Sequence, residues 1–435
     1  MMEFVELTDK EFSKEVKKLH NANFYQTTAW AELKKDNGWD ALYVGLKDNN
    51  KIIGASLILI KKFVLGTYMG YAPRGFLIDF KNYEVLDFFT KELKKYAKSK
   101  KIVFIKIDPY YDYQERDADG NIVEGGPDNK DLVEHLKKLG YHHHGLNLDT
   151  YHELQPRWIE VLDIKDKTYD EVFKNMRKTT KKRINRSRNN YLRLVEIDKK
   201  EQLKDYKDLM QDTANRRGFI DRPLSYYEKM WEVLTKANMM KILLVEMDFK
   251  VLKEESEKEL KEVEDKLVHL ENGTGPYKQF LTDEKKAQEK DTLNKDKSSL
   301  EEKIKEAEDN IKKYGNTRYV STIMFIPYLK EMLCLLGASY VEYMKYNVQY
   351  LINDEMLKYS CDNHFDTYNT YGIDGYFGED SEGYGLFDFK RGLGCRVHEL
   401  IGEFDLVVNK AMYTTYNTSF KVYKKGKNAI HRIKR

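Results

Sequence analysis

Cysteine and long apolar runs are both scarce in this chain of 435 residues. The three cysteines, Cys334, Cys361 and Cys395, are an odd number and form no CxxC pair. This pattern excludes a disulfide framework and a zinc ribbon, and it is typical of a reducing compartment. The longest apolar run, residues 52–60, is far shorter than the ~20 residues that span a bilayer. Because the first residues are polar and acidic, they predict no signal peptide, and we expect a cytoplasmic protein.

Neither sign of charge dominates, because the chain has 75 basic and 72 acidic residues and a formal net charge of +3. The total charge therefore indicates no class of partner, and local clusters of charge are more informative. The length exceeds that of one ordinary domain, since single hydrophobic cores stop growing at about 250–300 residues. We therefore expect at least two domains.

Hydrophobic periodicity predicts the same order of elements twice along the chain. The first half reads β-α-α-β-β-β-α-β, and from residue 158 nearly the same order restarts without sequence identity between the halves. This order is that of acetyl-CoA-dependent N-acyltransferases, so we expect an α/β (α+β) fold with two acetyltransferase-like (GNAT-type) lobes. The first lobe is predicted at 1–153, the second at 154–250 and 316–410, and a basic C-terminal tail at 411–435.

Residues 251–315 interrupt the second lobe with a different pattern. Leucine, valine and isoleucine recur there every three and four residues among charged side chains, and a Gly-Pro turn divides the segment. Such a narrow stripe is typical of a coiled-coil seam. We predict an antiparallel coiled-coil arm that leaves from a hairpin loop, where insertions are well tolerated. Its first helix is rich in glutamate, a pattern that repels phosphates, and dimerisation is one possible role of the arm.

The loops that hold a cofactor in acyltransferases are missing. Residues 71–82 and 335–347 occupy the expected places, and neither contains the glycine-rich RxxGxG loop that binds a pyrophosphate. The chain also has no GxxxxGK[ST] loop for ATP. We therefore expect no cofactor, and an acyl group that arrives already activated on another molecule.

One segment is strongly cationic, with no acidic residue between Glu171 and Glu196. The pattern predicts a single helix over 169–190 with a broad cationic face that suits phosphates. A merely solvated basic helix is the alternative. The candidate phosphate-binding residues are Lys174, Arg177, Lys178, Lys181, Lys182, Arg183, Arg186 and Arg188.

Asp108 follows a strand that runs into Pro109, where a carboxylate can face a cleft and orient an amine. The alternative is a carboxylate that caps the following turn. The run His142, His143 and His144 predicts no metal site, because adjacent residues point in different directions and no partner motif accompanies them.

Several short motifs resemble the Fem family of non-ribosomal peptidyltransferases, and the resemblance extends from about Phe4 to Asn409. The motifs are FYQTTAWAELKK, YAPRGF, FIKIDPYY, ANRRGFIDRPLSYYEKM, LFDFKRGLG and HELIGEFDLVVN. Members of this family transfer an amino acid from aminoacyl-tRNA to the side-chain amine of the stem peptide in a peptidoglycan precursor. The resemblance implies the same reaction here, with an aminoacyl ester as the activated donor and a precursor that is lipid-linked or nucleotide-linked. It also implies that the eight candidate phosphate-binding residues of segment 169–190 bind tRNA, and that contact with tRNA is the alternative to dimerisation as the role of the arm.

The resemblance also implies roles for individual residues. Lys390 matches the FxK lysine near the transferred group, and it is a candidate catalytic residue together with Asp108. Lys34, Arg222 and Tyr226 match residues that bind the diphosphate of the precursor. Where some relatives have a tyrosine for the same diphosphate, this chain has Leu336.

Two alternatives to this function stay open. An aminoacyl-tRNA–protein N-terminal transferase would share the donor but would need no diphosphate site. A non-catalytic coiled-coil interaction protein would leave Asp108 and Lys390 on open surface. The main interpretation places the protein in the cytoplasm, with peripheral contact at the inner face of the plasma membrane.

Overall fold

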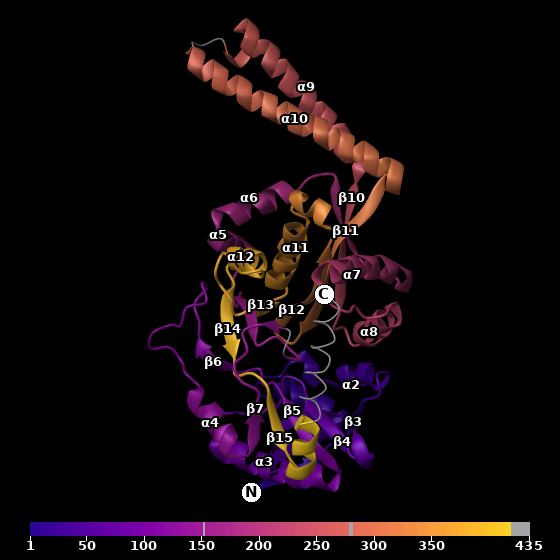
Figure 1. The fold of residues 1–435 in the computed structure, drawn as a ribbon, viewed down its shortest axis with the longest axis vertical. Helices are drawn as coiled ribbons and strands as arrows, with labels where there is room; N and C mark the ends of the chain where they lie inside the picture. The colour runs from indigo at the N-terminus through magenta and orange to yellow at the C-terminus, as the bar shows by residue number, and fades with distance from the viewer. Residues whose placement is uncertain (151–152, 278–281, 419–435) are drawn as a thin grey trace.

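The computed structural model of the chain describes residues 1–150, 153–277 and 282–418. It contains two lobes, each built on one β-sheet, and a helical arm that projects from the second lobe (Figure 1). The expected α/β (α+β) fold, with two acetyltransferase-like lobes and an inserted antiparallel coiled coil, is confirmed.

The sheet of the first lobe has the order β1-β2-β3-β4-β5-β15-β7. Its strands are β1 (Met2–Glu6), β2 (Asp40–Asp48), β3 (Lys51–Lys62), β4 (Tyr68–Ala72), β5 (Ile102–Ile107), β15 (Phe404–Val407) and β7 (Tyr141–His143). Side chains alternate between the two faces of a strand, and apolar side chains of this sheet are buried on both faces. Helices therefore cover both sides of the sheet. The helices are α3 (Tyr83–Ser99) and α4 (Lys130–Lys138) on the outer face, and α1 (Asp9–Glu15) and α2 (Thr28–Lys35) on the face toward the second lobe.

The sheet of the second lobe has the order β6-β14-β8-β13-β12-β11-β10-β9. Its strands are β6 (Asp112–Glu115), β14 (Arg396–Leu400), β8 (Trp158–Asp163), β13 (Thr367–Ile373), β12 (Glu331–Ser339), β11 (Thr317–Tyr328), β10 (Lys241–Asp248) and β9 (Leu192–Glu196). Two helices cover the face toward the first lobe, α7 (Leu203–Arg217) and α8 (Leu224–Lys236). The other helices of this lobe are α5 (Tyr169–Asn175), α6 (Lys178–Ser187), α11 (Val348–Asp362) and α12 (Tyr384–Leu393).

Each sheet contains a strand from the other half of the chain. β15 lies between β5 and β7 in the first sheet and pairs antiparallel with both. β6, from the first half of the chain, pairs with β14 at the edge of the second sheet. The segments predicted as two lobes therefore each contribute one strand to the sheet of the other.

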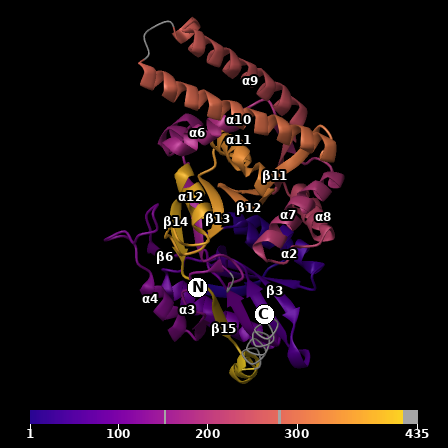
Figure 2. The same ribbon diagram turned by 45° about the horizontal axis from the view of Figure 1, so that its top comes forward.

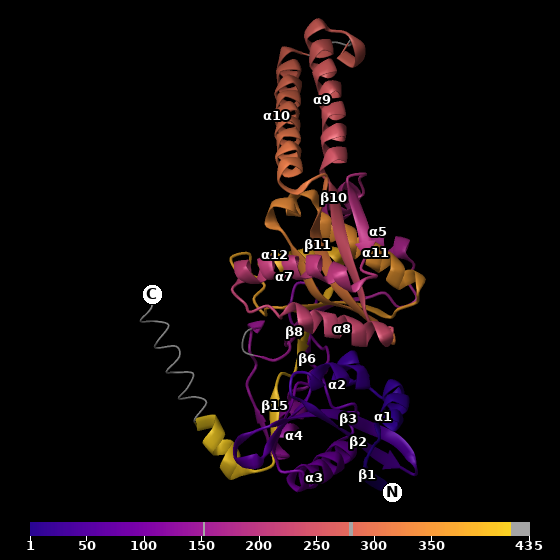
Figure 3. The ribbon, with the colours of Figure 1, turned by 90° about the vertical axis from the view of Figure 1, so that its right-hand side faces the viewer.

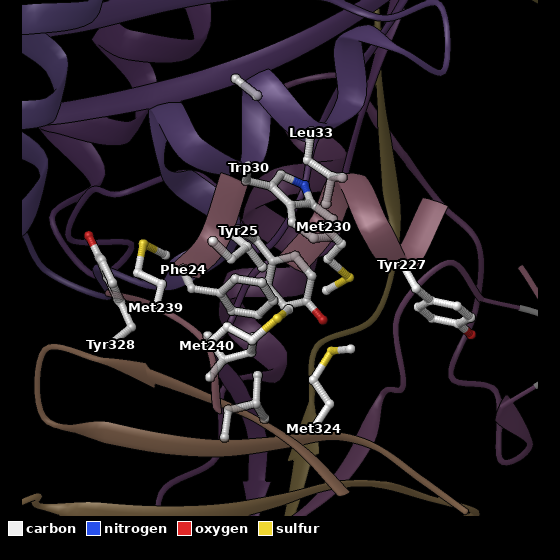
Figure 4. Close-up of a cluster of buried hydrophobic side chains, with 14 of the residues drawn as sticks. Phe24, Tyr25, Trp30, Leu33, Tyr227, Met230, Met239, Met240, Met324 and Tyr328 are labelled. Atoms are coloured by element: carbon white, nitrogen blue, oxygen red, sulfur yellow. The ribbon is translucent and has the colours of Figure 1, made fainter. Parts of the chain in front are cut away.

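One hydrophobic core joins the lobes. Phe24, Tyr25 and Trp30 of the first lobe lie in the same buried cluster as Met240 and Met324 of the second (Figure 4). Aromatic side chains bury large apolar areas, so this cluster fixes the lobes against each other. The two lobes meet along a packed interface, with α2 of the first lobe against α8 of the second (Figure 3).

The arm consists of α9 (Phe249–Asn272) and α10 (Asp283–Tyr314), and it leaves the sheet between the antiparallel strands β10 and β11. The predicted seam is confirmed, because four apolar side chains are buried between the helices: Val263, Leu270, Leu293 and Leu300. At the helix rise of ~1.5 Å per residue, the 24 residues of α9 extend about 36 Å. Figures 1 and 2 show the arm leaning over the side of the second lobe that carries α6.

The predicted single helix over 169–190 is wrong. The chain leaves helical geometry at Met176 and Arg177, which separates α5 from α6. Met176 is buried, and the backbone N–H of Arg177 donates to the carbonyl oxygen of Gly392 at 3.1 Å. Contact with the end of α12 therefore fixes the backbone at the break.

The predicted basic tail lies only partly within the described residues. Residues 410–418 are helical, and 419–435 lie outside the part of the chain that the structure describes. Among the described residues, no helix is both long and apolar enough to cross a membrane.

Candidate active site at the junction of the lobes

α2 brings the first predicted acceptor residue to the junction of the lobes. The side chain of Thr27 caps this helix by accepting from the N–H of Trp30, and Lys34 follows in the last turn. Lys34 Nζ lies 4.2 Å from the centre of the Trp30 ring and donates to the hydroxyl of Tyr226 at 3.1 Å. Because Tyr226 belongs to α8, this hydrogen bond joins the two lobes.

Arg222 lies beside this pair, directly before α8. Its guanidinium carbon is 5.3 Å from the centre of the Tyr226 ring, a cation–π distance. The neighbouring carboxylate of Asp221 is paired with Lys207 and does not neutralise Arg222. The three predicted acceptor residues, from both lobes, therefore come together, and we call them the junction site.

The electrostatics of the junction site suit an anion. Burial, together with the nearby charge of Arg222, lowers the pKa of Lys34 to about 8. A phosphate between the two cations would relieve their repulsion, and it could accept a hydrogen bond from the hydroxyl of Tyr226. Arginine next to a phenol is a favourable combination for a phosphate oxygen.

Asp108 stands at the end of β5 and is only 2% exposed, so it does not line an open cleft. Its carboxylate accepts from the backbone N–H of Arg74 at 2.6 Å and from the hydroxyl of Tyr71 at 2.8 Å. Burial raises the pKa of Asp108 to about 6, although Arg74 offsets part of the shift. The carboxylate does not cap the turn after Pro109 through these bonds; it fixes the loop that follows β4.

Tyr371 lies in a bulge of β13 beside Lys390. Its backbone has φ +66°, in the left-handed region, a conformation that costs a bulky residue roughly 1–3 kcal/mol. Lys390 Nζ donates to the carbonyl oxygens of Tyr371 at 3.0 Å and Gly372 at 2.8 Å. The buried ammonium therefore supports the strained segment of the strand.

A continuous series of contacts connects the junction site with Lys390. The Trp30 ring beneath Lys34 packs edge-on against Tyr25 at 5.0 Å. The hydroxyl of Tyr25 lies 2.7 Å from that of Tyr371, whose carbonyl accepts from Lys390. Lys34 and Lys390, which are far apart in the sequence, are thus connected through the contacting residues Trp30, Tyr25 and Tyr371.

Glu160 on β8 is the site residue that sequence reasoning missed. It is 0% exposed, and within the described residues neither carboxylate oxygen has a hydrogen-bond partner. Burial raises the pKa of Glu160 to about 8, although Lys390 lowers it in part, and burial likewise lowers the pKa of Lys390. A charged residue inside the apolar strand WIEVLDI is the one signal that could have identified it.

The sequence suggested that the cations of the predicted tRNA-binding segment have no counter-ions. In the structure, two of them are paired with carboxylates. Arg177 pairs with Asp388 at 2.7 Å, and Arg188 pairs with Asp354 at 2.8 Å. Both carboxylates come from remote parts of the chain, which local sequence cannot reveal. Of the others, Lys181 is half-buried, and the exposed ones are Lys174, Lys178, Lys182, Arg183 and Arg186.

The histidine run takes part in the first sheet. The His143 ring stacks on Phe404 at 4.4 Å, and His144 Nε2 lies 2.7 Å from a carboxylate oxygen of Asp405. Leu336, where some relatives have a tyrosine, lies on β12 and packs partly buried against the shared core.

The fold defines a two-lobed α/β protein of acetyltransferase-like architecture, and its sequence lacks the glycine-rich phosphate loops of cofactor-dependent acetyltransferases. The lobes share a core, a cation pair with a phenol lies between them, and a coiled-coil arm extends from the second lobe.

A model of the FemAB family matches residues 7–421, and the chain belongs to this family. The aminoacyltransferase FemA of Staphylococcus aureus (strain MRSA252) is 30% identical over 425 residues, which cover 97% of this chain and 99% of FemA. FemA of strain MW2 is similar to the same extent. The crystal structure of FemX matches with a TM-score of 0.71 and 27% identity, over 95% of this chain and 99% of FemX. The resemblance inferred from the motifs is confirmed: the protein is an aminoacyltransferase of peptidoglycan synthesis.

Proposed function

We propose that the protein transfers an amino acid from aminoacyl-tRNA to the stem-peptide amine of a lipid-linked peptidoglycan precursor, at the inner face of the plasma membrane. The observation that carries this proposal is the junction site, where Lys34, Tyr226 and Arg222 meet from two lobes. Two cations beside a phenol suit the charge of a diphosphate, whereas the cationic N-terminus of a protein gains nothing from them.

The chemistry needs neither ATP nor a cofactor, because the donor is an ester. The amine nitrogen attacks the ester carbonyl carbon, a C–N bond forms, and the C–O bond to the terminal ribose breaks. The proton lost by the amine ends on the ribose hydroxyl. Lys390 keeps one N–H after its two hydrogen bonds to carbonyl oxygens, and in our proposal it stabilises the oxyanion. Asp108 acts as a positioning residue that fixes Arg74 and Tyr71.

The donor is proposed to lie across α6 and the arm. The exposed cations Lys178, Lys182 and Arg186 belong to α6, on the side over which the arm leans (Figure 2). The side chain of Asn190, just after α6, donates to Glu255 at the base of the arm at 2.6 Å. A tRNA on α6 would therefore lie within reach of the arm.

The direct test is a transfer assay with lipid-linked precursor, total tRNA and labelled amino acids. We expect labelled precursor only when charged tRNA is present, and its loss after treatment with RNase. Transfer from acetyl-CoA without RNA would contradict the proposal. Transfer to a protein N-terminus in place of the precursor would favour the N-terminal transferase.

Binding of the acceptor is expected to weaken as the pH rises through about 8, the value to which the pKa of Lys34 is lowered. The ammonium is charged below this pH and attracts the diphosphate, and above it the charge is lost, so Kd should rise by up to about tenfold per pH unit. Equilibrium binding of the acceptor between pH 7 and 9.5, without donor, measures this. Lys34→Arg should flatten the profile, because a guanidinium stays charged. An unchanged slope in Lys34→Arg would assign the titration to another group.

Replacing Lys178, Lys182 and Arg186 together with alanine is expected to weaken tRNA binding. Each lost phosphate contact should reduce the slope of log K against log salt by about 0.7–0.9. The matched control is the alanine replacement of Lys91, Lys95 and Lys98, three exposed lysines of α3 in the first lobe. Equal salt slopes in both triple variants would mean that α6 is only a solvated surface.

A further inference from the structure

The connection between α7 and α8 presents apolar side chains to solvent. Gly218 ends α7 with φ +74°, which turns the chain outward. Phe219 is then 41% exposed and Ile220 97% exposed. The loop is nevertheless anchored, because Asp221 accepts from the hydroxyl of Tyr227 at 2.5 Å. An ordered loop therefore holds an isoleucine almost fully in water.

A second turn of the same kind belongs to the first lobe. Between β3 and β4, Val64 is 52% exposed and Leu65 is 92% exposed. Lys61, just before this turn, donates to the carbonyl oxygen of Asn37 at 3.1 Å, three residues after Lys34. This turn thus lies on the side of the molecule that carries the end of α2.

We call the two turns the apolar tips (Phe219–Ile220 and Val64–Leu65); one belongs to each lobe, and each adjoins a segment that carries part of the junction site. Arg222, which belongs to that site, is two residues from Ile220, and Lys34 lies close to the end of β3. Figure 3 shows the α7–α8 connection and the helix at 410–418 on one side of the molecule, and the Tyr416 ring of that helix contacts Phe63 at 4.9 Å.

Both tips are accompanied by exposed cations. Lys61 and Lys62 precede the first, and Arg216 and Arg217 precede the second. Two acidic groups lie near the second tip: the side chain of Asp221 is buried and paired with Lys207, and the carboxylate of Glu382 lies 4.0 Å from Arg217. Apolar side chains beside cations suit a surface that is hydrocarbon below and anionic above, which is the interface of a bilayer with acidic lipids.

We propose that the apolar tips dock the protein on an anionic lipid bilayer, an inference that rests on the proposed function. One tip from each lobe enters the interface, so that the junction site lies at the depth of the lipid headgroups. The diphosphate of a lipid-linked precursor lies at that depth. Two separated tips with polar surface between them do not form the continuous apolar patch that a stable protein interface buries.

The test is binding to vesicles without any acceptor or tRNA. Vesicles of phosphatidylglycerol with phosphatidylcholine are compared with phosphatidylcholine alone, using the wild type, Ile220→Asn, Leu65→Asn and the double variant. Asparagine tolerates the left-handed backbone of Leu65, at φ +54°. The matched control is Ile122→Asn, since Ile122 is 54% exposed on the loop after β6. We expect each tip variant to bind the anionic vesicles roughly tenfold more weakly, and the control to bind like the wild type.

A second assay separates this inference from the proposed function. Transfer to a water-soluble nucleotide-linked muropeptide, without vesicles, should be the same for the tip variants and the wild type. A wild type that transfers the amino acid but ignores anionic vesicles would overturn the inference and leave the function intact. The inference would also be overturned if the tip variants bound anionic vesicles as strongly as the control Ile122→Asn does. Absence of transfer to any acceptor would refute the function, while the vesicle result would still decide the docking surface.

Discussion

Lys390→Met is expected to reduce turnover by about two to three orders of magnitude, the usual cost of losing one group that stabilises an oxyanion. The side chain is 5% exposed, and its ammonium supports the backbone at Tyr371. Methionine fills a similar volume, removes the charge and leaves two carbonyl oxygens without their donor. We expect a lower unfolding temperature as well, so activity should be measured well below it, with single-turnover rates as the readout.

Glu160→Gln is the matched control for Lys390→Met. The pKa of Glu160 is raised to about 8 by burial, so the group is largely protonated at pH 7, and glutamine resembles that form. The control should therefore retain turnover within about tenfold at pH 7. If it loses as much turnover as Lys390→Met, then the buried pair acts as a unit and the oxyanion role of Lys390 alone is wrong.

Arg222→Ala is expected to raise the KM for the acceptor by about ten- to a hundredfold, the worth of one charged hydrogen bond to a phosphate. Turnover should change little, because this contact is the same in the ground state and the transition state. The measurement is steady-state kinetics with acceptor and donor varied separately.

Lys229→Ala provides the comparison for Arg222→Ala. Lys229 lies on α8, and its ammonium is 3.8 Å from a carboxylate oxygen of Asp36, so its removal also takes a cation from the contact between α8 and α2. Its KM should stay within about twofold of the wild type, since partly exposed ion pairs are worth little. If Arg222→Ala and Lys390→Met share one kinetic phenotype, the separation of acceptor and donor roles fails.

Much of the fold could be predicted because its signals are local. The seam of the arm follows from residues three and four apart, and the start of α1 follows from Thr8 with Glu11 three residues on, the sequence signature of the capping box that the structure shows there. The junction site was predicted from the motifs, since each of its residues is identified by the short stretch around it. What the motifs could not provide is the contact between Lys34 and Tyr226, which depends on how the two lobes pack.

The parts that could not be predicted depend on tertiary contacts. The break between α5 and α6 occurs at residues with no helix-breaking character, and it is held by a hydrogen bond to Gly392. The burial of Asp108 and the counter-ions of Arg177 and Arg188 likewise come from segments far away in the chain. Charge patterns in one segment show which groups are present but do not show their neighbours.

The exchanged strands decide when this chain can finish folding. The ribosome delivers residues from the N-terminus, so β5 and β7 are made about 260–300 residues before β15, the strand that lies between them. Until residues 404–407 emerge, the nascent first lobe keeps two open strand edges, which invite pairing with other chains. Neither sheet is complete until residues 396–407 have been synthesised, and a nonsense codon near residue 400 would therefore leave the sheet of the N-terminal lobe without β15.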